Sequence, residues 1–370
     1  MKRTRKRKLI FLVIIILIIS SSAYLTIKYK NNPAPNQEIK QAIESISAAK
    51  KMEANKYAKK KLDAAENILK LAMKEWDTQN QKVIISRDYT QVRSLAIQAS
   101  EVANQAGNEA FTERNSIKEK LDKQLHSIEN QLDEFEKNYK NLPLVKHIFE
   151  KFSKAQMRFK EAQANYRNSD YKQAKTAANE AENLITPTLK TAQNILDGYF
   201  NDYPVWKKNA NYARKLSAGG NIVILINKFE SKCSVLKSGK TIAEYDAEFG
   251  SNWMSHKSVM GDNATPEGIY KITLKKNGSK TKYYKALLLN YPNAEDKKRF
   301  DVSKKNGAIS KNSKIGDLIQ IHGHGGKGVN WTEGCIALDN KDMDKLCAMV
   351  GENTPVIIIG TEKPINEYLK

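Results

Sequence analysis

One cysteine and one histidine stand at the two ends of a glycine-rich stretch near the carboxyl end of this 370-residue chain. His322 follows Leu318, Ile319 and Ile321, which predict a short buried strand, and Cys335 lies further along in a loop. A thiol is a good acyl nucleophile only as the thiolate, and an imidazole brought close by folding commonly forms one near neutral pH. The pair therefore predicts acyl chemistry, with Cys335 as nucleophile and His322 as proton acceptor and donor.

The elements that position this pair are mostly strands. The sequence becomes β-rich after Gly219 and Gly220, and a helix is expected between Asp339 or Asn340, either of which can cap it, and Gly351. The expected strands cover residues 222–226, 242–249, 270–274, 283–289 and 356–359. These features predict a mostly-β domain with one or two helices.

Three segments of this domain carry a resemblance to a known family. They are Ile321-His322-Gly323 with Thr332-x-Gly334-Cys335-Ile336-Ala337-Leu338, then Thr265-Pro266-Glu267-Gly268-Ile269-Tyr270, and Leu289-Asn290-Tyr291-Pro292-Asn293. They resemble the active-site motif, the TPxG(F/Y) turn and the YPN segment of L,D-transpeptidases with a YkuD-type catalytic domain. The likeness is greatest to the ErfK/YafK-like branch and covers residues 221–360.

The resemblance implies a reaction on peptidoglycan stem peptides without metal or cofactor. Cys335 would attack the carbonyl between an L-configured centre and D-alanine, and an amine of a neighbouring stem would resolve the thioester, giving 3-3 cross-links or exchange of the terminal D-residue. Backbone amides around Gly334 and Cys335 would hold the oxyanion, and the Gly323 carbonyl would orient the imidazole of His322. Thr332 is a possible secondary residue of the active site.

Two positions depart from the usual family motif. Glu333 stands where most members carry His, and Ala337 where most carry Arg, so a contact to a substrate carboxylate is missing. Lys327 or Lys341 could replace that arginine, although both also fit ordinary surface lysines. Two alternatives stay open: a peptidoglycan amide hydrolase of the same branch, such as an L,D-carboxypeptidase, and an inactive wall-binding scaffold.

His324 and the other two cysteines of this region allow other chemistry. In an extended segment His324 would share a face with His322, and with Cys335 the two could form a zinc site, although Gly325 and Gly326 interrupt the strand and no metal is predicted. We expect Cys233 and Cys347 to be small core residues, with a disulfide between them as the alternative.

The amino terminus predicts export. Six of the first eight residues are Lys or Arg, and residues 9–27 run without a charge, which is close to a bilayer-spanning length. The basic end (residues 1–8) would stay in the cytoplasm and the catalytic domain would lie outside, on the periplasmic or cell-wall side. An uncleaved single-pass anchor is the main interpretation, and a signal peptide cleaved near Ser21-x-Ala23 is the other.

Between residues 38 and 216 the composition favours helix, because Ala, Lys, Glu, Gln and Leu dominate and only two glycines occur. A weak repeat relates residues 88–102 to residues 170–184, with Asp-Tyr-x-Gln and four shared small or apolar positions, which predicts two related helical hairpins. Five aromatic side chains are expected in the core: Tyr57, Trp76, Tyr89, Tyr166 and Tyr171.

The whole chain is therefore predicted to have several domains. A linker (28–37) follows the membrane segment, the all-α middle (38–216) comes next, and a short tail (361–370) follows the catalytic domain. The net charge of +21 suits an anionic neighbourhood, and the membrane segment favours an envelope location over nucleic acid. The middle could be a stalk, or could bind anionic wall polymers or another envelope protein.

Overall fold

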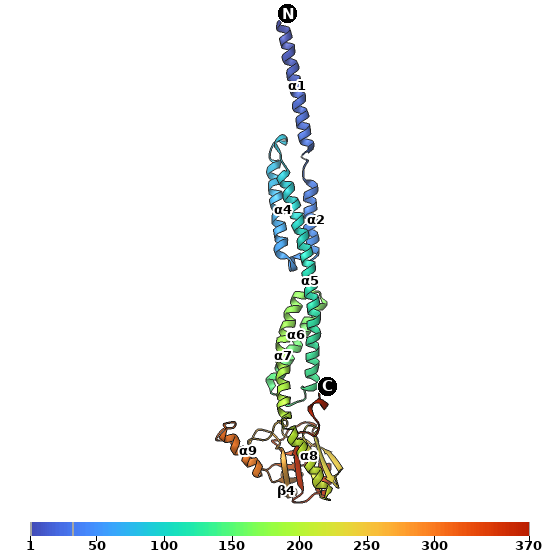
Figure 1. Cartoon of the computed structure of the whole chain (residues 1–370), viewed down its shortest axis with the longest axis vertical. Coiled ribbons are helices and arrows are strands. Elements are labelled where there is room, and N and C mark those ends of the chain that lie inside the picture. The colour runs from blue at the N-terminus through green and yellow to red at the C-terminus, as the bar shows by residue number, and fades with distance from the viewer. Residues whose placement is uncertain (1, 32, 370) are drawn as a thin grey trace. The chain divides into compact units, whose positions relative to one another are not determined.

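A computed structural model describes residues 2–31 and 33–369 of the chain. A helical region forms the amino-terminal and middle part, and a mostly-β domain forms the carboxyl-terminal part (Figure 1). This agrees with the predicted fold class. The chain divides into two compact units, one running up to His126 together with Ala162–Thr176, and the other made of Ser127–Glu161 together with the chain from Ala177.

Helices make up the first unit. They are α1 (Lys2–Asn31), α2 (Asn36–Lys51), α3 (Ala54–Tyr57), α4 (Lys59–Asn80), the 3-10 turn η1 (Ile84–Ser86) and the first part of α5 (Thr90–Asn138), together with the end of α6 (Lys146–Arg167) and the start of α7 (Tyr171–Phe200). Within α1, Lys6–Ile27 is 22 residues long with a mean hydropathy of 2.6, enough to cross a membrane, and a signal sequence near an amino terminus would look the same. The predicted linker is shorter than expected, since α1 runs to Asn31 and α2 begins at Asn36.

The two halves of the sequence repeat have the same structural setting. Residues 88–102 lead into α5 and residues 170–184 lead into α7, which α6 precedes. Tyr89 and Tyr171 are each 6% exposed, and the repeated alanines are fully buried, namely Ala96 and Ala99 in α5 and Ala178 and Ala181 in α7. Small residues at helical spacing let neighbouring helices approach closely, so the same positions serve packing in both copies.

The mostly-β domain is built on an eight-stranded sheet in the order β3-β2-β1-β8-β4-β5-β6-β7. Its strands are β1 (Val223–Asn227), β2 (Lys232–Lys237), β3 (Lys240–Asp246), β4 (Gly268–Asn277), β5 (Lys285–Leu289), β6 (Gln320–His322), β7 (Ile336–Ala337) and β8 (Pro355–Ile359). The remaining elements are α9 (Ala294–Lys305), α10 (Asn340–Met349) and the turns η2 (Gly278–Lys280) and η3 (Ile365–Glu367). The pairs β1/β8 and β6/β7 are parallel, and the other neighbours are antiparallel.

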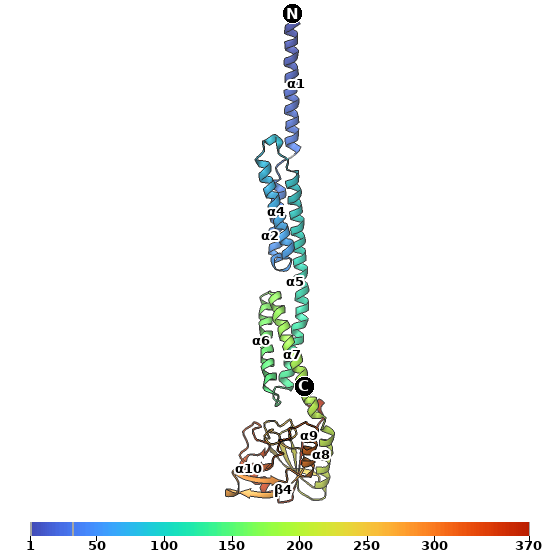
Figure 2. The same ribbon diagram turned by 90° about the vertical axis from the view of Figure 1, so that its left-hand side faces the viewer.

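A helix that precedes the expected domain boundary covers the centre of this sheet. Helix α8 (Tyr203–Ala218) contacts β1, β2, β3 and β8, and it lies beside the sheet in both views (Figures 1 and 2). Trp206 of α8 is 1% exposed, and a Cβ at Gly360 would overlap its ring. Strands β1 and β8 are buried along almost their whole length, which explains why their sequences are nearly continuous apolar runs.

Candidate active site

Strand pairing brings the predicted nucleophile and base together. Strand β6 ends at His322 and β7 begins directly after Cys335, and the two strands pair in parallel with Ile321 opposite Ile336 and His322 opposite Ala337. Neighbouring strands lie about 4.8 Å apart, so Cys335 is next to β6 and two positions from the level of His322. The loop of residues 323–334 that separates them in sequence is closed by this short pairing.

The imidazole of His322 is held in one tautomer. Its Nδ1 lies 2.6 Å from the backbone oxygen of Gly323, as the family resemblance implied for this glycine. A carbonyl oxygen only accepts, so Nδ1 carries the proton and Nε2 keeps its lone pair. Nε2 is buried and makes no hydrogen bond within the described residues, which leaves it available as a proton acceptor.

Aromatic rings fix the plane of this imidazole. The Tyr283 ring stacks on His322 with centroids 3.6 Å apart and an interplanar angle of 9°, and the Trp331 ring meets it edge-on at 6.1 Å. His322 is fully buried, and burial is the main reason that its pKa is lowered to about 4. The hydrogen bond to Gly323 opposes this shift, but the imidazole is neutral at pH 7.

Cys335 is half-buried at the wall of a cleft. Its Sγ donates to the backbone oxygen of Leu318 at 3.7 Å, and burial raises the pKa of the thiol. A backbone hydrogen bond from Gln320 and the charges of Lys282 and Lys257 oppose that shift. Thiol and imidazole are therefore both neutral at pH 7, and the thiolate would form by proton transfer during the reaction.

The cleft has a volume of about 570 Å³. It is lined by Lys257, Met260, Gly261, Lys282, Tyr283, Gly316, Asp317, Leu318, Ile319, Gln320, Trp331, Thr332, Glu333 and Cys335. Its two cations, Lys257 and Lys282, were missed in the sequence because neither lies near Cys335 along the chain. The Lys257 ammonium binds Asp262 at 2.9 Å and is nearly buried, so the fold holds it in place at the cleft.

The lysines expected to replace the missing arginine do not line this cleft. The Lys327 ammonium sits 3.2 Å above the centre of the Trp331 ring, and Lys341 lies in the first turn of α10. Ala337 is fully buried and exchanges two backbone hydrogen bonds with Glu248. A side chain as large as arginine at position 337 would therefore have to displace the residues packed around it.

The backbone conformation just before Cys335 is constrained by close contacts and hydrogen bonds. Gly334 has φ +129°, and a Cβ there would lie 2.6 Å from the backbone oxygen of Ala264. Thr332 Oγ1 donates to the Cys335 oxygen at 2.6 Å and accepts from the Gly334 amide at 3.2 Å. Thr332 therefore shapes the turn that presents the thiol, and the oxyanion role of the amides around Gly334 and Cys335 stays a prediction.

Two further expectations about strand β6 fail for backbone reasons. Leu318 has φ +58° and is 56% exposed at the cleft, so it lies outside the buried strand, which begins only at Gln320. His324 has φ +69° and is exposed, with its amide bound to Asn340 Oδ1 at 2.8 Å, so it does not continue the face of His322. Among the described residues no group of His, Cys, Asp and Glu could hold a metal.

The carboxylate of Glu248 organises the glycine-rich loop and was not singled out in the sequence. It accepts from the amides of Lys327 and Gly328, the latter at 2.6 Å, and from Trp331 Nε1 at 2.7 Å. By accepting from Nε1, Glu248 positions the Trp331 ring, which meets the imidazole of His322 edge-on. A buried acid at the end of an alternating strand is the signal that could have drawn attention to it.

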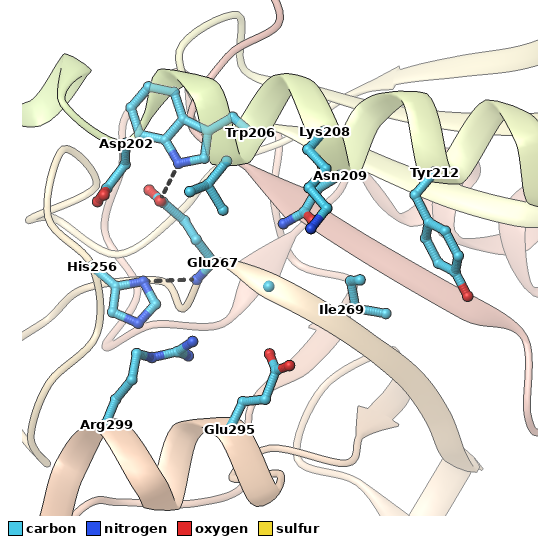
Figure 3. Close-up of a pocket in the computed structure, with 12 residues that line it drawn as sticks. Asp202, Trp206, Lys208, Asn209, Tyr212, His256, Glu267, Ile269, Glu295 and Arg299 are labelled. Carbon is cyan, nitrogen blue, oxygen red and sulfur yellow. Dashed lines mark hydrogen bonds between the residues drawn. The ribbon is translucent and has the colours of Figure 1, made fainter. Parts of the chain in front are cut away.

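The TPxG turn serves the interior rather than the cleft. Glu267 is buried and binds Lys228 at 2.7 Å, Trp206 Nε1 at 2.6 Å and the Tyr199 hydroxyl at 3.1 Å. Figure 3 shows its carboxylate pointing to Trp206 of α8, and its backbone amide pointing to His256, along a second cavity of about 570 Å³. The turn therefore fastens α8 to the domain.

The three cysteines are unpaired. Cys233 is buried in β2, and Cys347 is half-buried in α10, so the alternative of a disulfide between them was wrong. Asp339 caps α10, since its side chain accepts from the Lys341 amide at 2.8 Å. Of the five aromatic residues expected in the helical core, Tyr57, Tyr89 and Tyr171 are buried and the other two are half-buried.

Comparison with known proteins places this geometry in a family. Residues 221–358 match the family profile of the L,D-transpeptidase catalytic domain, YkuD. The catalytic part of this chain is an L,D-transpeptidase domain. The helical region lies outside the matched residues. No curated protein matches the chain. The ErfK/YafK-like branch stays a prediction.

Several solved structures are similar to the chain over this part. Bd1075 of Bdellovibrio bacteriovorus is 26% identical, with 40% of this chain and 52% of that chain covered and a TM-score of 0.30. The L,D-transpeptidase of Stackebrandtia nassauensis is 18% identical, with 48% and 67% covered and a TM-score of 0.27. The catalytic domain of the Enterococcus faecium L,D-transpeptidase is 15% identical, with 38% and 98% covered and a TM-score of 0.25. The chain thus spans about half the length of Bd1075.

Proposed function

We propose that this chain is a cell-wall L,D-transpeptidase that acts on peptidoglycan stem peptides through a thioester at Cys335. The observation that carries the proposal is the His322 imidazole, neutral and oriented by Gly323, in the strand next to a half-buried thiol on a cleft. The L,D-transpeptidase domain at residues 221–358 supports the substrate class.

The reaction follows from these groups. His322 Nε2 takes the thiol proton while the Cys335 sulfur attacks the carbonyl carbon of the bond to the terminal D-residue. The imidazolium returns that proton to the leaving amine, and D-alanine departs from the acyl-thioester. An amine of a second stem then attacks the thioester and gives its proton to His322, and the thiol is regenerated as the 3-3 cross-link forms.

Binding of the donor is assigned to Lys257 and Lys282. They are the cations of the cleft, and a substrate carboxylate near Cys335 would be attracted to them instead of to the arginine that Ala337 replaces. The membrane position is part of the same proposal: α1 anchors the chain in the cytoplasmic membrane, and the catalytic domain lies outside.

The test is conversion of defined tetrapeptide muropeptides by the purified full-length chain, with and without an added amine acceptor. We expect a thioester mass on the wild-type protein, none on Cys335→Ala, and cross-linked product when the acceptor is present. Release of D-alanine at the same rate without acceptor and without cross-links would instead assign the hydrolase activity. Turnover by Cys335→Ala, or absence of any thioester, would overturn the proposal.

A further inference from the structure

Three consecutive apolar side chains are exposed at one end of the first helical unit. Val83, Ile84 and Ile85, here called the apolar loop, are 68%, 61% and 54% exposed in the connection between α4 and α5. Single exposed apolar residues are common on proteins, but three in a row at one tip indicate an interaction site.

Hydrogen bonds join the residues after the apolar loop to the end of α4. Arg87 donates from Nη2 to the Asn80 oxygen at 2.8 Å and from Nε to the Lys82 oxygen at 3.0 Å. The Tyr89 hydroxyl donates to Asn80 Oδ1 at 2.8 Å, and the Asp88 amide donates to Gln79 Oε1 at 2.9 Å. The backbone is tied to the end of α4, so the three side chains are held outward by the fold.

The internal repeat provides a matched loop for comparison. Asp88-Tyr89 before α5 correspond to Asp170-Tyr171 before α7. Residues 81–89 separate α4 from α5, whereas only residues 168–170, which are Asn, Ser and Asp, separate α6 from α7. A three-residue polar connection is therefore sufficient for this hairpin, and the apolar loop is an addition to the first copy.

The apolar loop lies where the chain leaves α1. Arg93, in the first turn of α5, donates to the Pro33 oxygen at 3.0 Å and to Glu38 Oε1 at 2.6 Å. Three helical residues rise about 5 Å, so the start of α5 is close to the level of Pro33. Helix α1 and η1, which carries Ile84 and Ile85, also contact each other.

We propose that the apolar loop inserts into the outer surface of the same bilayer that α1 crosses. The occupant is a lipid surface because the loop sits at the exit of the one described helix that is long and apolar enough to span a membrane. Apolar side chains gain free energy by leaving water for the acyl region, and the basic residues Lys82 and Arg87 on either side suit anionic headgroups. The inference rests on the membrane position proposed above for α1.

The consequence is a second point of attachment. A single spanning helix lets the part outside the membrane tilt freely, whereas a helix and a neighbouring inserted loop define a plane. The loop would thus fix the first helical unit against the membrane surface without any further protein.

The test places a nitroxide at Ile84→Cys in the full-length Cys335→Ala chain, reconstituted in phosphatidylethanolamine vesicles that contain phosphatidylglycerol. Relaxation by oxygen, which concentrates in hydrocarbon, is compared with relaxation by a water-soluble nickel chelate. Asn168→Cys in the matched polar loop is the control. The Cys335→Ala chain without a new cysteine gives the background from Cys347, since Cys233 is fully buried.

We expect the label at position 84 to lose nickel accessibility and to gain oxygen accessibility relative to the label at position 168. Equal nickel accessibility at the two positions overturns the proposal. Protection at position 84 that disappears when the protein is diluted in lipid also overturns it, because a second copy of the chain would then cover the loop.

A third label, at Ile15→Cys, separates this inference from the membrane proposal. Hydrocarbon signals at position 15 and aqueous signals at position 84 would leave α1 in the membrane and reject the loop insertion alone. Aqueous signals at both positions would reject the membrane position as well.

Discussion

At the scale of single residues, His322 and Cys335 differ from a preformed thiolate and imidazolium pair. Burial lowers the pKa of His322 to about 4 and raises the pKa of Cys335, so both groups are neutral over the physiological range. The base is then ready to accept a proton and the thiol is protected from adventitious reaction. The proton must move when the substrate carbonyl arrives, which makes the orientation of the imidazole decisive.

The two neighbouring histidines should respond differently to substitution. His322→Gln removes the base, and we expect the acylation rate to fall roughly 10²- to 10⁴-fold. His324→Gln changes an exposed side chain after the strand has ended, and should leave the rate within a few-fold of wild type. Thioester formation followed by mass spectrometry measures both, and a circular dichroism melt checks folding. Similar losses in both variants would contradict the assignment.

His322 should also make the stability of the domain depend on pH. Its pKa is about 4 in the folded state and about 6.5 when unfolded, so between these values the unfolded chain binds more protons and stability rises with pH. On acidification from about pH 6.5 to about pH 4 this histidine should cost on the order of 3 kcal/mol.

Urea unfolding followed by tryptophan fluorescence at several pH values would measure this loss. His322→Gln should reduce the slope in that window, because glutamine does not titrate there. The matched control is His324→Gln, at an exposed position two residues away, which we expect to leave the slope unchanged. A slope that is the same in wild type and in His322→Gln would refute the linkage.

At the scale of elements, the glycine-rich loop depends on one carboxylate. Glu248→Gln keeps the shape of the side chain but removes the charge that binds the amides of Lys327 and Gly328 and the indole of Trp331. Hydrogen bonds to a charged group contribute about 1.5–3 kcal/mol each, so the loop should loosen. We expect faster amide exchange over residues 324–332 and a lower acylation rate.

A nearby acid provides the control for this loop. Glu244→Gln in β3 changes a carboxylate that binds Ser234 at 3.0 Å, away from the glycine-rich loop. It should alter neither amide exchange in residues 324–332 nor the acylation rate. If Glu248→Gln behaves like Glu244→Gln, then the loop is held by its backbone alone.

The motif residues were predictable because their chemistry and spacing are local. The buried strand into His322, the loop that carries Cys335 and the cap at Asp339 all follow from residues within the same short stretch. Tyr283 and Glu248 reach the site from elsewhere in the chain, and no local pattern marks a ring that stacks on a distant imidazole. Leu318 was misplaced because periodicity takes no account of a left-handed φ at an apolar residue.

At the scale of the molecule, the helical middle could be predicted from composition, but its end could not. Helix α8 has the same amphipathic character as the helices before it, and nothing local shows that its buried face meets a sheet. The sheet partners are β1, β2, β3 and β8, and β8 follows α8 by more than a hundred residues. A boundary placed at the change of composition therefore falls after α8, whereas the packing includes α8 in the catalytic fold.

The last prediction concerns that boundary. A fragment of residues 221–370 lacks α8 and would expose Glu267, whose buried carboxylate would lose its bonds from Trp206 and Tyr199 and would keep Lys228 as its partner. Losing a buried tryptophan alone costs about 3–5 kcal/mol, which is comparable with the whole stability of many domains. We expect this fragment to unfold without cooperativity, whereas residues 196–370, which retain α8 and Tyr199, should unfold in one cooperative transition.

Thermal unfolding of the two fragments by circular dichroism would decide the boundary, and Trp206→Ala in the longer fragment separates the indole from the rest of α8. That variant should melt well below its parent, because the cavity it leaves lies against Gly360, directly after the end of β8. Val205→Ala, at an exposed position one residue earlier, is the matched control and should melt like the parent. A cooperative, equally stable 221–370 fragment would show that α8 merely rests on a complete domain, and the catalytic unit would then begin at β1.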